Sequence, residues 1–133
     1  MISSENTVKA ALVANIRDNP SSAFSGVWTT AYHGDEPTTF PCLNIDLLGE
    51  PERAQSTEMN LHSAIEATYE IKGYTAKTAT KAQAKALVSE AADVMCSLGF
   101  SMYSGIIDSS TDNYNCYVAR FRRVIGSDDG LIN

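Results

Sequence analysis

Residues 61–72, with the sequence LHSAIEATYEIK, constrain the fold more than any other part of the chain. Side chains alternate along this stretch, because Ile65, Tyr69 and Ile71 fall on one side while Glu66 and Glu70 fall on the other. Successive side chains of a β-strand point to opposite faces of a sheet. This period of two therefore predicts a long central strand with one buried face and one solvent-facing face.

The flanking segments show helical and strand periods in turn. Val8, Leu12 and Ile16 recur every four residues, as on the buried stripe of a helix, and Thr80 with Gln83 fits a capping box. The expected elements, in chain order, are a helix over residues 4–18, a short strand over 27–33, a strand over 42–48, the central strand over 61–72, a helix over 81–98, and strands over 100–107 and 114–125.

This order, α-(β)-β-β-α-β-β, predicts the α+β class, with a single, mostly antiparallel β-sheet and two helices packed on one face. The 133 residues fit a single domain spanning residues 1–133. Residues 49–60 are polar and lack a period, so we expect a long arm between two strands. Residues 126–133 are expected to form a short flexible tail.

Composition limits the classes of partner. The formal net charge is −6, which argues against a general nucleic-acid binder, although DNA can slide past an acidic wall without sticking. The chain has no apolar run near the roughly 20 residues that a membrane span needs, and its start does not resemble a secretory signal. A cytosolic protein with Cys42, Cys96 and Cys116 as free, buried thiols is the default expectation.

The sequence offers few catalytic residues. His33 and His62 are its histidines, and a pair formed by Cys42 and His62 on neighbouring strands is formally possible. No recognised signature surrounds the cysteines, no pair of ligands has zinc spacing, and no glycine-rich phosphate loop is present. We therefore expect no catalytic, cofactor or metal site, and a protein that is not an enzyme.

Two charged groups are candidate interface residues. The first is basic and lies on the last strand, where it could bind phosphate or pair across strands with Glu66 and Glu70. The second lies in the polar arm and fits either a solvated loop or a charged rim of a channel. The candidates are Arg120, Arg122 and Arg123 on the strand, and Glu50, Glu52, Arg53 and Glu58 in the arm.

The second face of the predicted sheet is half apolar, since Val118 and Val124 stand among its charged residues. A partly apolar face and an exposed sheet edge both call for a partner, often another copy of the same chain.

A family resemblance follows from the order of these segments. An amphipathic helix and a Trp-bearing connector precede a strand in FPCLNIDLL, a polar arm and a long strand ending EIKGYTA. The helix KAQAKALVSEAADVMCSLGF, which ends in Leu-Gly-Phe, and the closing strand YVARFRRVI complete the pattern. Nearly the whole chain resembles the tail terminator, or tail completion, proteins of long-tailed bacteriophages and related neck and tail proteins.

The resemblance implies a structural virion protein that forms a homo-oligomeric ring, usually of six copies, at the head-proximal end of the tail. The ring ends the tail tube, joins it to the head–tail connector protein and lets DNA pass without specific binding. The protein would sit in the virion, and in the host cytoplasm during assembly. The alternatives are another neck or tail component, such as a connector or tube subunit, and a small cytosolic ligand-binding domain or enzyme.

Overall fold

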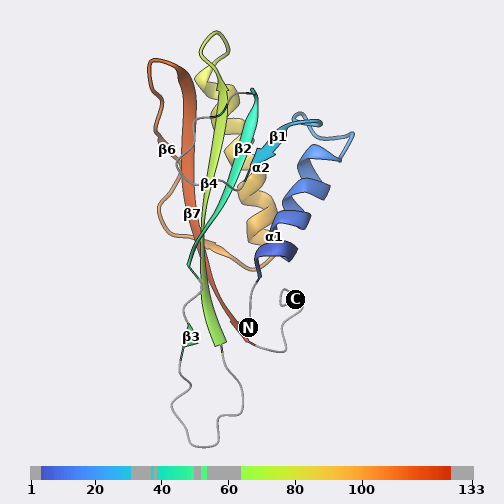
Figure 1. Cartoon of the computed structure of the whole chain (residues 1–133), viewed down its shortest axis with the longest axis vertical. Helices are drawn as coiled ribbons and strands as arrows, with labels where there is room; N and C mark the ends of the chain where they lie inside the picture. The colour runs from blue at the N-terminus through green and yellow to red at the C-terminus, as the bar shows by residue number, and fades with distance from the viewer. Residues whose placement is uncertain (1–3, 31–36, 38, 50–51, 54–63, 127–133) are drawn as a thin grey trace, which may run out of the picture.

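The computed structural model describes residues 4–30, 37, 39–49, 52–53 and 64–126 (Figure 1). Within these ranges, seven strands form one mixed sheet with the spatial order β1-β2-β4-β7-β5, in which β3 also pairs with β4 and β6 with β7. The α+β class predicted from the sequence is confirmed. The strands are β1 (Trp28–Thr30), β2 (Cys42–Gly49), β3 (Glu52–Arg53), β4 (Ala64–Ala76), β5 (Ser101–Met102), β6 (Ile107–Asp108) and β7 (Tyr114–Gly126).

The centre of the sheet is the antiparallel pair β4 and β7. Each strand has 13 residues, and they pair without a shift from Ala64 opposite Gly126 to Ala76 opposite Tyr114. β2 runs antiparallel along the other side of β4. β1 lies parallel to β2, so the sheet is mixed, with one parallel pair at its edge.

The first helix is α1 (Glu5–Leu12), which continues as the π-helical turn η1 (Val13–Arg17). Val8, Leu12 and Ile16 are fully buried, as their spacing predicts. The Ser4 side chain makes no cap hydrogen bond to the helix, and its hydroxyl lies 2.7 Å from the Tyr69 hydroxyl of β4. The N-cap residue of α1 is therefore tied to the sheet.

The second helix is α2 (Lys81–Ser97), and its start and end follow the predicted signals. Thr80 and Gln83 form a reciprocal capping box, and Gly99 adopts a positive φ of 89° just beyond the helix end. α2 packs closely on β4 at Gly73, where an added Cβ would lie 2.7 Å from Cγ2 of Val88.

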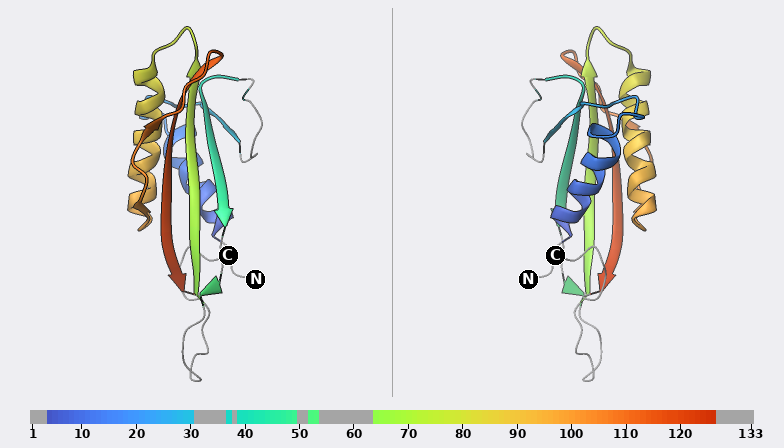
Figure 2. Two further views of the ribbon diagram at one scale, coloured as in Figure 1. Left: turned by 90° about the vertical axis from the view of Figure 1, so that its left-hand side faces the viewer. Right: turned by 90° about the vertical axis from the view of Figure 1, so that its right-hand side faces the viewer.

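The two faces of β4 differ in burial. The first face (Ile65, Ala67, Tyr69, Ile71 and Gly73) belongs to the hydrophobic core or contacts α2, whereas the second face (Glu66, Thr68, Glu70, Lys72 and Tyr74) is mostly polar. Figure 2 shows β2, β4 and β7 in front of α1 in its left view and behind α1 in its right view. That both helices pack on one face stays a prediction, which the contacts of Tyr69 with Ser4 and of Gly73 with Val88 support.

Two expectations about the strands and one about a cysteine need correction. The single strand expected over residues 100–107 is wrong, because the chain forms two short strands, β5 and β6, separated by Gly105 with a positive φ of 72°. The central strand extends beyond residue 72 to Ala76, because the chain after Gly73 still pairs with β7. Cys96 is exposed rather than buried, because it lies on the outer side of α2.

Candidate functional site

The second face of the sheet carries a neutral set of charges, although the whole chain is acidic. Across β2, β4 and β7, this face contains three acidic and three basic side chains in the described ranges, so its formal charge is zero in a chain of −6. The acidic residues lie on β2 and β4, and the arginines lie on β7. The six residues are Asp46, Glu66, Glu70, Lys72, Arg120 and Arg122.

Glu70 is at the centre of this face. Its side chain is only 7% exposed, and it accepts a hydrogen bond of 2.9 Å from Nε of Arg120 on β7. Nζ of Lys72 lies 3.4 Å from its other carboxylate oxygen. The hydrogen bond to Glu70 also raises the pKa of the Arg120 guanidinium. The predicted cross-strand pairing of the β7 arginines with β4 carboxylates therefore occurs at Glu70, whereas Glu66 lies opposite Val124.

Large exposed apolar side chains gather on the same face. Trp28 is 40% exposed and lies beside Cys42, whose side chain points to this face, and Ile107 is 52% exposed beside Val118. Val124 is 47% exposed. The Tyr103 ring, 42% exposed, lies over Arg122, with the guanidinium carbon 5.1 Å from the ring centre.

These four apolar side chains include most of the large hydrophobic residues that are exposed in the described ranges, the other being Leu48 at the bulge that ends β2. Exposed apolar side chains that share one face mark an interaction surface more often than scattered ones do. We name this surface the sheet-face patch: Trp28, Asp46, Glu70, Tyr103, Ile107, Arg120, Arg122 and Val124.

The predicted arm residues separate into two groups. Glu50 and Glu58 lie outside the described residues. Glu52 and Arg53 form β3, where they pair with Ile65 and Ala64 at the start of β4. The structure therefore brings the backbone at Glu52 and Arg53 next to the central strand.

The three predicted arginines do not act together. Arg120 and Arg122 belong to the sheet-face patch, whereas Arg123 points to the first face. Its Nη1 donates a hydrogen bond of 2.6 Å to the carbonyl oxygen of Leu98, at the end of α2. A cation near a helix C-terminus stabilises the terminal carbonyl groups, which gives Arg123 a structural role.

Sequence reasoning missed Asp46, Tyr103 and Ile107 as members of the patch. Asp46 could have been found, because it alternates with the core residues Leu43 and Ile45 along β2. Tyr103 and Ile107 alternate with the core-side residues Phe100 and Met102, but this pattern could not show that they lie beside Arg122 and Val118, because that depends on pairing with β7.

The cysteines of the second face are buried thiols. Burial raises the pKa of Cys42 to about 12 and that of Cys116 to about 11. The two residues flank Tyr74 in a small cluster that includes Phe40 and Tyr114. Since the thiolate is the reactive form of cysteine, neither residue is set up as a nucleophile. Cys42 lies opposite Tyr74 on β4, while His62, its formally possible partner, and His33 lie outside the described residues.

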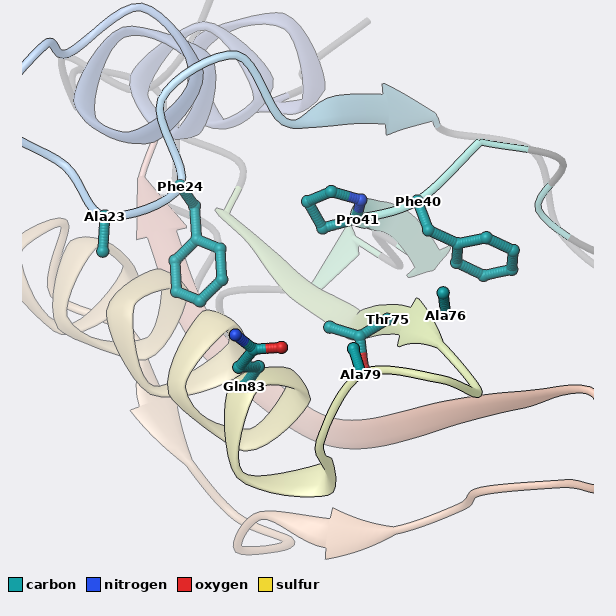
Figure 3. A pocket seen from close by; sticks show the side chains of 8 residues that line it. All are labelled: Ala23, Phe24, Phe40, Pro41, Thr75, Ala76, Ala79 and Gln83. Carbon is teal, nitrogen blue, oxygen red and sulfur yellow. The ribbon is translucent and has the colours of Figure 1, made fainter.

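A cavity of about 260 Å³ lies between the loop after η1, the start of β2 and the N-terminal end of α2 (Figure 3). Phe24, Phe40 and Pro41 supply its apolar wall. Its polar side chains are already engaged, because Thr75 donates to the carbonyl oxygen of Thr80 and Gln83 belongs to the capping box. Ligand sites usually have 300–1,000 Å³ and several convergent polar groups, so this cavity gives weak support for a small-molecule site.

Within the described ranges, no group of three or more His, Cys, Asp or Glu residues is placed to hold a metal ion. In the same ranges, no helix is long and apolar enough to cross a membrane.

Comparison with known proteins does not assign a family. No protein-family model matches the chain, and no curated protein matches it. The sheet-face patch is therefore the feature of the described structure from which a function can be argued.

Proposed function

We propose that the protein is a structural subunit that forms a ring at the head-proximal end of a phage tail, where it ends the tail tube and joins it to the head connector. The observation that carries the proposal is the sheet-face patch. Such a surface fits a protein that works by association with other protein chains.

The resemblance in the order of the sequence segments supports the choice of a tail terminator among assembly proteins. The polar arm between β2 and β4 would supply contacts to the neighbouring ring or line the channel. The acidic balance of the chain, with a net charge of −6, suits a channel that DNA passes without binding.

The first test is the mass of the purified protein over a concentration series, with negative-stain images of the same samples, alone and with tail tubes. Rings, or rings that appear when tubes are added, are the expected result. A strict monomer that ignores tubes would overturn the proposal and favour the ligand-binding alternative.

A second test concerns the arm. Charge reversal of Glu50, Glu52 and Glu58 to lysine should reduce infectivity, because it adds positive charge where DNA would pass or where a neighbouring ring would make contact. The matched control reverses three exposed acids elsewhere, Asp18, Asp93 and Asp112, and should leave infectivity near that of the parent. Equal infectivity of both triple variants would remove the arm from the proposed role.

A further inference from the structure

The sheet-face patch allows a more specific inference, which does not depend on the ring. We propose that this patch binds the same patch of a second copy, so that two sheets pack face to face about a twofold axis running along β4. The ring proposal uses this patch only as a sign that the protein associates with other chains, so a twofold contact at the patch and a ring formed through other surfaces can each fail alone.

The distribution of charge selects the direction of the axis. In one row across the sheet, Asp46 on β2, Glu70 on β4 and Arg120 on β7 stand side by side. A twofold axis along β4 reverses the order of the strands in the second copy. It therefore places Arg120 of the second copy over Asp46 of the first, and Asp46 of the second copy over Arg120 of the first. An axis across the strands would instead place the two copies of Arg120 over each other.

The apolar side chains select the same axis. Trp28 lies at the β1 edge, and Ile107 lies at the opposite edge, one row further along the sheet. Reversal of the strand order brings Ile107 of the second copy close to Trp28. Packed sheets cross at roughly 30°, so residues one row apart are near neighbours across the interface.

Charge balance makes the pairing compatible with an acidic chain. A charged face of one sign would repel its own copy, but the six charged side chains of this face sum to zero. Glu70, which would lie near the axis and face its own copy, is already held between Arg120 and Lys72.

The size of the face is adequate. β4 and β7 have 13 residues each and β2 has 8. With about 3.3 Å per residue and about 4.8 Å between strands, these three strands alone cover roughly 540 Å² of flat area. The side chains and the two edges, with Trp28 and Ile107, add to this area, which approaches the roughly 800 Å² per partner of a standard interface.

Thiol cross-linking tests the pairing directly. Thr68 lies on the second face of β4, next to the proposed axis, so a short bis-maleimide should join two copies of Thr68→Cys in a Cys96→Ser background into a covalent dimer; a linker is used because facing sheets pack about 10 Å apart, beyond the roughly 7 Å between Cα atoms that a direct disulfide allows. The matched control, Lys85→Cys in the same background, places the thiol on the exposed side of α2 and should stay uncross-linked. Efficient cross-linking of the control and none of Thr68→Cys would overturn the inference.

Sedimentation over a concentration series provides the second measurement. Ile107→Arg introduces a charge into the proposed interface at a side chain that is exposed in the monomer, so the fold should be retained. We expect the dimer dissociation constant to rise tenfold or more, on the order expected for loss of an interface anchor. The control Ala82→Arg, on the exposed surface of α2, should leave the constant unchanged.

The outcomes separate this inference from the proposed function. Rings without cross-linking at Thr68→Cys would overturn the face-to-face pair and leave the ring standing. A dimer that cross-links at Thr68→Cys but never forms rings with tail tubes would support the pair and overturn the terminator role. A strict monomer at every concentration, both alone and with tail tubes, would overturn both.

Discussion

Gly73 gives the sharpest test of how α2 packs on the sheet. It lies inside the paired part of β4, a strand interior where glycine is otherwise unfavourable. A Cβ at this position would lie 2.7 Å from Cγ2 of Val88, 3.1 Å from the carbonyl oxygen of Ala84 and 3.3 Å from Cγ of Leu87. Since carbon atoms pack at about 3.5–4.0 Å, Gly73→Ala requires the helix or the strand to move by roughly 1 Å.

The expected change is a balance of two effects. Overpacking of a well-packed core typically lowers stability by about 1–3 kcal/mol. Replacement of glycine by alanine raises stability by about 0.4–1 kcal/mol, because alanine reduces the conformational entropy of the unfolded chain. Val88 is fully buried, and a β-branched side chain in a helix has one strongly preferred rotamer, so it cannot turn aside. With the middle of each range, a cost of about 2 kcal/mol and a gain of about 0.7 kcal/mol, we expect Gly73→Ala to lower the free energy of unfolding by about 1.3 kcal/mol.

Urea unfolding followed by far-ultraviolet circular dichroism measures this change, with an unchanged m-value as the sign of an intact two-state transition. Gly126→Ala is the matched control, because Gly126 is the last residue of the long strand β7 and no atom lies within 4 Å of its added Cβ. In a Val88→Ala background the cost of Gly73→Ala should shrink, as expected for residues in contact. Equal stability of the Gly73→Ala and Gly126→Ala variants would refute the packing argument.

Three further predictions concern single side chains. Thr80→Ala should destabilise the protein by about 1 kcal/mol in the same urea assay, because it removes the capping box of α2. In the native protein at pH 8, a thiol reagent should label Cys96 quickly, because Cys96 is exposed, and should label Cys42 and Cys116 slowly, because burial raises the pKa of both thiols. Mass spectrometry of the labelled peptides measures the order of labelling. Hydrogen bonds from the Ser110 side chain and backbone lower the pKa of Asp108 to about 2. The stability that Asp108 contributes is therefore present above the ordinary carboxyl pKa near 3.8 and is lost as pH falls from about 4 toward 2. The carboxyl chemical shift of Asp108, followed by NMR over this range, measures the pKa.

The local elements follow from the sequence because their signals are local. The alternation in residues 64–72 and the capping box at Thr80 both depend on neighbours a few residues away, and both appear in the structure as expected. The sequence also predicts which residues of β7 face the core. Ala119 and Phe121 alternate with Arg120 and Arg122, and this alternation does not depend on which strand β7 pairs with.

The tertiary structure decided what pairs with what. Ile107 and Tyr103 joined the second face because β6 and β5 both pair with β7, which places Ile107 beside Val118 and Tyr103 against Arg122. No local pattern predicts that Arg120 rather than Arg122 binds Glu70, because the partner of Glu70 depends on the register between β4 and β7, whose paired residues here are fifty positions apart. The sequence determined which residues could lie on each face, and long-range register determined which of them meet.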